Sequence, residues 1–239
     1  MIVMILGSGP GVVVCRDWSR GAVDRIVAIN NAWQVRPDWD YLVHPEDFPN
    51  DRHPPETGAD RQIITATEYV PANNDYGGII YAGATMAFSA GYWALAALRP
   101  TVLAYLGCDM VYDHKTTHFY GTGTADPLRP DPTLQDLGAK SARLELLAAR
   151  QGCAVVNLSS SASRLVFARC DIADIRQQKP RALNPASMDR ALSAEQALGA
   201  ICPSGRYWQG PALDATALAG VDQLWRDAHA AACAGSRAA

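Results

Sequence analysis

The chain has no excess of basic residues and no close pair of cysteines. Its 21 Lys and Arg residues stand against 24 Asp and Glu residues, which gives a formal net charge of -3 over 239 residues. A nucleic-acid-binding domain typically carries a basic patch, so this balance argues against a nucleic acid as the partner. The six cysteines show no C-x-x-C pair and no clustered metal-ligand spacing, which favours reduced thiols in a cytoplasmic protein: Cys15, Cys108, Cys153, Cys170, Cys202 and Cys233.

The chain also lacks an apolar run long enough to span a membrane. Residues 83–98 form a long apolar stretch, but it is shorter than the roughly 18 to 20 residues that a spanning helix needs. The opening MIVMIL has no basic leader and runs directly into a glycine turn, so we expect a strand there and no signal peptide. A hydrophobic content of 49% is sufficient for a folded core.

Short apolar runs alternate with helical patterns along most of the chain. The runs predict strands at residues 2–6, 25–30, 39–44, 62–65, 101–106 and 153–158. Helices are predicted at 12–21, 83–98, 133–151, 193–199 and 212–233, and loops at 49–60, 71–78 and 121–132. This alternation predicts an α/β fold with a Rossmann-like, doubly wound, mostly parallel sheet over residues 1–169. Residues 170–239 are expected to form a small helical C-terminal appendage.

The helix expected at 133–151 has the clearest amphipathic pattern in the chain. Leucines recur at helical spacing along it, as expected for an amphipathic helix. Thr133 and Asp136 form an N-cap pattern at its start, and Gly152 is a suitable residue to end it.

A glycine-rich turn, GSGPG, follows the first predicted strand. Glycines allow backbone N–H groups to approach a phosphate, and a following helix adds a positive dipole, so Gly7, Ser8, Gly9 and Pro10 are candidate nucleotide-binding residues. The turn is neither a P-loop, which would need Gly-Lys-Ser/Thr, nor a G-x-G-x-x-G fingerprint, because the third glycine is missing. A tight turn without a ligand is an equally good interpretation.

Two asparagines, Asn30 and Asn31, end the second predicted strand. Their amides offer both donors and acceptors, so they could recognise a nucleobase or a ribose. The alternative is an Asx turn that closes the strand. The third strand similarly ends in the segment His44-Pro45-Glu46-Asp47, which could line the same crevice or simply form a turn at its proline.

A polar loop rich in titratable groups follows the strand at 101–106. In open α/β sheets ligands bind beyond the carboxyl ends of the strands, so this loop is a candidate for the chemistry. His118 could act as a general base near neutral pH, while Tyr112 and Tyr120 could donate hydrogen bonds to a leaving phosphate and Lys115 could pair with it. A solvated loop without a catalytic role is the alternative.

The same loop also allows a metal site. His114 and His118, together with Asp109 or Asp113, carry the ligand types that a divalent cation prefers. The residues alone do not choose between a metal site and acid–base chemistry.

Several of these stretches resemble, in order and spacing, the motifs of one known family. They are GSGPG at 7–11, AINN at 28–31, AGAT at 82–85, GCD at 107–109, HFYG at 118–121 and the later run at 155–165. Together they resemble the small bacterial sialyltransferases that use CMP-sialic acid, over about residues 1–167. The 6-hydroxymethylpterin diphosphokinase-like proteins share this frame.

The resemblance implies a role for each matched position. Gly7 to Gly9 would contact the nucleotide phosphate and Asn30 the cytidine, with Asn31 beside it, and Gly83 and Thr85 would belong to the nucleotide pocket. His118 would deprotonate the acceptor hydroxyl, near Asp109, and Tyr112 and Tyr120 would stabilise the departing CMP without a metal or other cofactor. The partners would be a nucleotide-sugar donor and a glycan or small-molecule acceptor. Whether the chain forms a homo-oligomer is left open.

The chain departs from that family at three places. Ser8 stands where the family usually has Asn, and Val111 stands where it has a tyrosine two places after the aspartate, with Tyr112 one step along. The lid before the histidine is short, because only residues 110–117 intervene. Two other functions therefore remain as alternatives: a Mg²⁺- and ATP-dependent diphosphate transfer of the pterin diphosphokinase kind, and a nucleotide-binding protein without catalysis.

Overall fold

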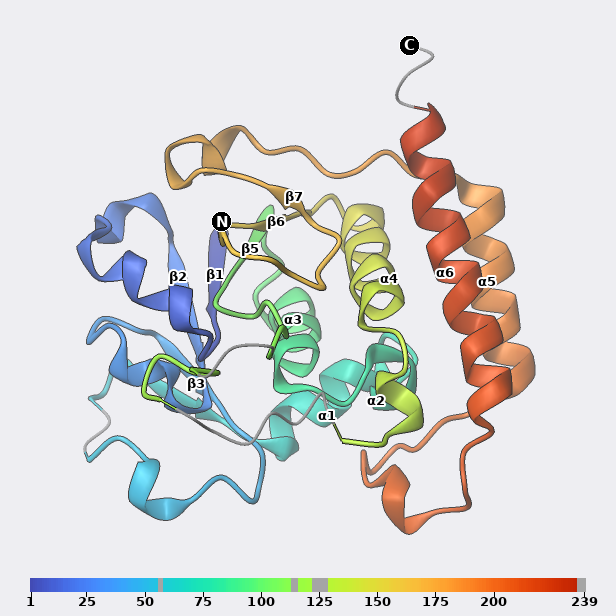
Figure 1. Cartoon of the computed structure of the whole chain (residues 1–239), viewed down its shortest axis with the longest axis horizontal. Coiled ribbons are helices and arrows are strands. Elements are labelled where there is room, and N and C mark those ends of the chain that lie inside the picture. Colours follow the sequence, from blue (N-terminus) through green and yellow to red (C-terminus); the bar gives the residue numbers. More distant parts are fainter. Residues whose placement is uncertain (56–57, 113–115, 122–128, 236–239) are drawn as a thin grey trace.

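The computed structural model describes residues 1–55, 58–112, 116–121 and 129–235, and its framework is one sheet (Figure 1). The sheet has seven strands in the order β4-β3-β2-β1-β5-β6-β7, and each neighbouring pair is parallel. The strands are β1 Ile2–Leu6, β2 Arg25–Ile29, β3 Tyr41–Val43, β4 Gln62–Ile64, β5 Val102–Leu106, β6 Ala154–Asn157 and β7 Ala168–Arg169. The Rossmann-like α/β prediction is confirmed, and the sheet within the described residues is wholly rather than mostly parallel.

The central strands are apolar on both faces because both faces of the sheet are covered. Every residue of β1 and β5 is buried, as expected for the middle of a parallel sheet. The α-helices cover one face: α1 Ala66–Asn74, α2 Ile79–Ala82, α3 Met86–Ala97 and α4 Leu137–Arg150. Short 3-10 helices cover the other: η1 Pro10–Asp17, η3 Asn30–Gln34 and η7 Ile172–Gln177. The helix expected at 12–21 is thus a 3-10 helix.

The loop expected at residues 71–78 is wrong over its first half, because α1 extends from Ala66 to Asn74 with Pro71 inside it. A capping box starts this helix: the Thr65 N–H donates to Glu68 Oε2 at 2.7 Å. Pro71 lacks only its own N–H, and its carbonyl still accepts from the Asp75 N–H at 3.2 Å. The capping box offsets part of the cost of the interior proline.

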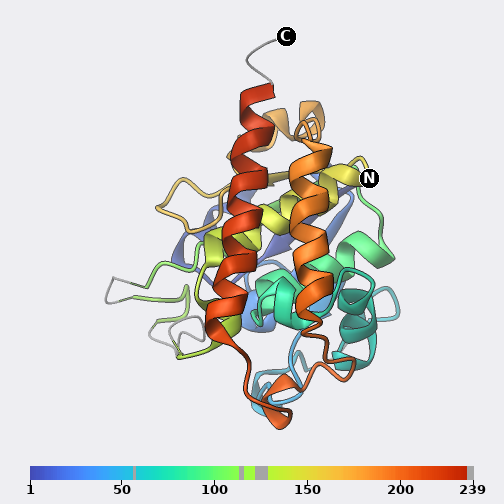
Figure 2. The same ribbon diagram turned by 90° about the vertical axis from the view of Figure 1, so that its right-hand side faces the viewer.

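The predicted start of helix α4 at residue 133 is wrong. The helix begins at Leu137, and Asp136 is its N-cap, accepting from the Ala139 N–H at 2.9 Å. It is also buried on all sides, because α5 Pro185–Leu198 and α6 Ala215–Gly235 pack side by side over its outer face (Figure 2). The first of these helices starts earlier than the predicted 193, at Pro185 after an Asn184 N-cap.

Charged side chains of α4 are buried against the C-terminal helices in ion pairs. Lys140 Nζ lies 2.8 Å from Asp222 Oδ1, and Arg143 Nε lies 2.6 Å from Glu195 Oε1. Glu145 Oε2 lies 2.6 Å from His229 Nε2. The α5–α6 pair therefore shares the core of the sheet domain, and its position on α4 is specified by paired charges.

Arg143 is the most extensively bonded of these residues. Its Nη2 donates to Glu195 Oε2 at 2.8 Å, and its Nη1 donates to the Tyr92 hydroxyl at 2.8 Å. The Trp225 indole N–H also donates to Glu195 Oε1, at 2.6 Å. Removal of one partner of such a pair leaves the other charge buried and uncompensated.

None of the helices in the described part of the chain is long and apolar enough to cross a membrane.

We expect Arg143→Ala to lower the free energy of unfolding by about 3–5 kcal/mol, because Glu195 would be left buried without its cation. Arg226→Ala is the matched control: Arg226 pairs with Asp136 on the surface, and such pairs contribute about 0–1 kcal/mol. Urea unfolding of both variants measures the difference. Equal losses would show that the buried pair does not anchor the C-terminal helices.

Candidate functional site

The strand order reverses between β1 and β5. The chain proceeds from β1 to β2, β3 and β4 on one side and from β5 to β6 and β7 on the other. The chain connections that leave β1 and β5 therefore lead to opposite sides of the sheet, and the carboxyl ends of these two strands are the position where ligands bind in folds of this kind.

The two loops at the switch point are in direct backbone contact. The Gly7 N–H donates to the Leu106 carbonyl at 2.8 Å, and the Gly9 N–H donates to the Gly107 carbonyl at 2.8 Å. A Cβ on Gly7 would lie 2.3 Å from the Gly107 oxygen, and one on Gly9 would lie 2.8 Å from it. Gly107 itself has φ +73°, and a Cβ there would meet Val12. The glycines are thus required for the packing of one loop against the other.

This packing limits what the glycine turn can offer to a ligand. The N–H groups of Gly7 and Gly9 are already used, so a ligand could approach their backbone closely but could not take these hydrogen bonds. Among the described residues nothing engages the amide or the hydroxyl of Ser8 or the amide of Gly11. These are the donors that the turn presents to the crevice.

A cleft of about 1090 Å³ occupies the crevice. Most of the predicted site residues line it: Gly7, Ser8, Gly9, Pro10, Asn30, Asn31, Thr85, Asp109, Tyr112, His118 and Tyr120. Gly83 is not among the lining residues; it turns the chain between α2 and α3 with φ +89°, and a Cβ there would lie 2.9 Å from Lys140 Cγ. Pro45 and Asp47 line the cleft, which confirms that the segment after β3 reaches the same crevice.

The segment with His118 is attached to the glycine turn. His118 and Gly121 exchange backbone hydrogen bonds of 2.9 and 3.0 Å, which closes a tight hairpin. The Phe119 N–H at its tip donates to the Ser8 carbonyl at 2.9 Å. Residues more than a hundred positions apart are therefore held together at the switch point.

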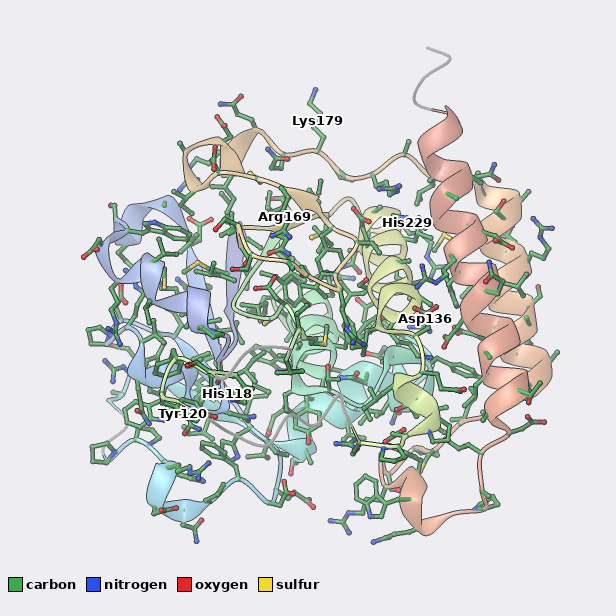
Figure 3. All side chains as sticks on the ribbon, viewed as in Figure 1. His118, Tyr120, Asp136, Arg169, Lys179 and His229 are labelled. Atoms are coloured by element: carbon green, nitrogen blue, oxygen red, sulfur yellow. The ribbon has the colours of Figure 1, made fainter. Side chains whose placement is uncertain are left out.

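The imidazole of His118 lies among hydroxyl-bearing side chains. Its Nδ1 is 2.8 Å from Thr117 Oγ1. The Tyr120 ring stacks on it with centroids 5.0 Å apart, and the Tyr112 ring lies at 6.2 Å. In Figure 3 the labelled His118 and Tyr120 lie together, on the opposite side of the molecule from His229 and Asp136.

Two of the proposed metal ligands, Asp113 and His114, lie outside the described residues, as does Lys115. Within the described ranges, no three or more His, Cys, Asp and Glu side chains are gathered as a metal site.

The Asp109 carboxylate is held by residues at the end of β6. The Ser159 hydroxyl donates to Asp109 Oδ2 at 2.6 Å, and the Asn157 amide lies 3.4 Å from Oδ1. The same amide donates to Ser163 at 3.1 Å. The sequence signals for this polar network are Asp109 after one apolar run and the asparagine and serines at the end of another.

The neighbouring Cys108 is buried, and burial raises the pKa of its thiol far above the usual range. The thiol is therefore protonated and unsuited to act as a nucleophile.

Three polar atoms on the β2 and β3 side are buried without a hydrogen-bond partner among the described residues: Asn30 Oδ1, Asn31 Oδ1 and His44 Nε2. The expected alternative of an Asx turn is therefore wrong, because neither asparagine oxygen closes one. His44 Nδ1 lies 2.9 Å from the Pro45 carbonyl, which can only accept, so Nδ1 carries the proton. In the neutral tautomer that has this proton on Nδ1, Nε2 is an acceptor.

Thr85 connects the cleft to α3. Its hydroxyl accepts from the Phe88 N–H at 3.3 Å and caps the helix, and Thr85, Met86 and Ala87 all line the cleft. The positive end of the dipole of α3 therefore faces the cleft.

Comparison of the chain with models of known protein families, with curated proteins and with solved structures found no match. The fold and the geometry of the cleft define the chain as a Rossmann-like α/β protein with a candidate ligand site at the switch point.

We expect Gly7→Ala to destabilise the protein by about 1–3 kcal/mol, because the added methyl group would overlap the Gly107 carbonyl and force the two loops apart. Gly11→Ala is the control: a Cβ there would make an ordinary 3.6 Å contact with Ser161 Oγ. Thermal unfolding of the two variants measures the effect. If Gly7→Ala is as stable as Gly11→Ala, the close loop contact is not a structural requirement.

Proposed function

We propose that this chain is a nucleotide-sugar-dependent glycosyltransferase of the sialyltransferase-like kind, with His118 as the general base. The observation that carries this proposal is the hydrogen bond from the Phe119 N–H to the Ser8 carbonyl. It holds a histidine hairpin against the glycine turn at the switch point, where a nucleotide would bind. A base and a nucleotide site adjacent to each other are what glycosyl transfer to a hydroxyl group requires.

The proposed reaction uses the residues around the imidazole. With Nδ1 donating to Thr117, Nε2 of His118 carries the lone pair that takes the proton of the acceptor hydroxyl. The acceptor oxygen forms a bond to the anomeric carbon of the sugar, and the bond from that carbon to the phosphate oxygen breaks. The hydroxyl groups of Tyr112 and Tyr120 donate hydrogen bonds to the departing CMP phosphate and stabilise its negative charge, the role that a metal ion would otherwise have.

The buried acceptor atoms support a base that carries an exocyclic amino group. Asn30 Oδ1, Asn31 Oδ1 and His44 Nε2 are all acceptors, and buried acceptors without a donor are costly. Asn30 and Asn31 line the cleft directly, whereas His44 does not line it but packs against Phe48, which does, with ring centroids 5.2 Å apart. Cytosine supplies an N4 amino group to such a site, whereas uracil presents a carbonyl at the same position.

We expect His118→Ala to lower turnover about 10²- to 10⁴-fold, the usual consequence of losing a general base. The rate of CMP release from a CMP-sugar, with acceptor or with water, measures it, and calorimetry with CMP should give an affinity close to that of the wild type. Arg16→Ala, which changes an exposed residue that does not line the cleft, is the control for both measurements. Unchanged turnover in His118→Ala would remove the histidine from the mechanism.

We expect CMP to bind more tightly than UMP, and Asn30→Ala to reduce that preference at a cost of about 1–3 kcal/mol in CMP binding. Calorimetry with CMP, UMP, GDP and ATP, each with EDTA or with Mg²⁺, makes the comparison. CMP binding that is insensitive to EDTA supports the proposal. Binding of ATP alone, and only with Mg²⁺, would favour diphosphate transfer instead, because that reaction needs the cation to bridge the phosphate oxygens.

A further inference from the structure

The described walls of the cleft contain few groups that can neutralise an anionic ligand. Its lining includes the carboxylates of Asp47 and Asp109, and Arg52 is the one Arg or Lys side chain in the described part of the lining. The amides of Gly7 and Gly9 already donate to the backbone carbonyls of Leu106 and Gly107 and are not free to bind an anion. A nucleotide phosphate carries at least one full negative charge at neutral pH, so it needs a cationic partner in such a site.

Arg52 lies on a segment whose backbone is held in place. It ends the 3-10 helix η4, Asn50–Arg52, and its N–H donates to the Pro49 carbonyl at 3.0 Å. Its own carbonyl accepts from the Trp33 indole N–H at 3.0 Å. The next residue, His53, stacks on the Phe48 ring with centroids 5.2 Å apart, which ties the helix to the wall of the cleft.

The guanidinium of Arg52, in contrast, has no hydrogen bond or ion pair with any described residue. Other arginines of the chain are used internally: Arg20 pairs with Asp40 at 2.7 Å, Arg36 with Asp38 at 2.7 Å, and Arg143 with Glu195. A fixed backbone, a side chain at the cleft and an unused guanidinium together describe a residue that is available to a ligand.

We propose that Arg52 binds the phosphate of the nucleotide and supplies the positive charge of the site. This inference rests on the proposed function, because it takes a nucleotide as the ligand. Arginine suits the role because its planar guanidinium can donate two parallel hydrogen bonds to two phosphate oxygens. Arg52 is a binding residue here, and the proton transfer remains with His118.

The experiment compares the affinities of CMP and cytidine for four proteins: the wild type, Arg52→Ala, Arg52→Lys and Arg16→Ala. The ratio of the two affinities isolates the contribution of the phosphate. We expect Arg52→Ala to lower CMP affinity about tenfold, the size of one charge-assisted hydrogen-bonding pair, and to leave cytidine affinity unchanged. Arg52→Lys should retain part of the preference, because it keeps the charge without the planar fork. Arg16→Ala should match the wild type.

Three outcomes would overturn the proposal, and they can be told apart. If Arg52→Ala keeps the full preference of the wild type for CMP over cytidine, the phosphate binds elsewhere in the cleft and only the role of Arg52 is lost. If Arg52→Ala weakens CMP and cytidine equally while thermal unfolding matches the wild type, Arg52 shapes the pocket without binding phosphate. If the wild type binds neither ligand, the proposed function fails, and the role of Arg52 fails with it.

Discussion

The structure depends on the close backbone contact between the loop that follows β1 and the loop that follows β5. Two hydrogen bonds, from Gly7 to Leu106 and from Gly9 to Gly107, join the central strands beyond the point where the sheet ends. Because a Cβ at either position would overlap a carbonyl, the contact is possible only with glycine. The contact also holds the Ser8 carbonyl in place as the acceptor for the Phe119 N–H. The position of the histidine hairpin therefore depends on the glycine turn.

The far side of the molecule is organised by buried charges, and it also supports the cleft. The segment before α4 is hydrogen-bonded to the turn before α3: Thr133 Oγ1 accepts from the Ala84 N–H at 3.2 Å, and Arg129 donates to the Ala84 carbonyl at 3.1 Å. Ala84 precedes Thr85, which caps α3 at the cleft. The ion pairs with α5 and α6 therefore hold α4 in place. The segment that leads into α4 in turn contacts Ala84, next to the wall of the candidate site.

The elements that could be predicted from the sequence are those whose signal is local. The strands β1 and β5 are short apolar runs that each end at a glycine, and burial on both faces follows from that composition. The convergence of GSGPG, the asparagines after β2 and HFYG on one cleft follows from the parallel order of the strands.

What could not be predicted depends on partners that are distant in the chain. Lys140, Arg143 and Glu145 resemble a solvated helix face until α5 and α6 supply their partners Asp222, Glu195 and His229. In the sequence the amides of Gly7 and Gly9 look free to bind a ligand. Their hydrogen-bond acceptors, the carbonyls of Leu106 and Gly107, lie about a hundred residues later in the chain. Arg52 is one of several basic residues in a polar segment, and only the Trp33 contact and the cleft distinguish it from the others.

The central claim is that a cytidine nucleotide occupies the switch-point cleft between the glycine turn and the histidine hairpin. Titration of the ¹⁵N-labelled protein with CMP, followed by amide chemical shifts, tests it most directly. The account predicts shifts at Ser8, Asn31 and Phe119 that saturate together, with the amides of α5 and α6 unchanged. Saturating shifts confined to α5 and α6 would contradict it.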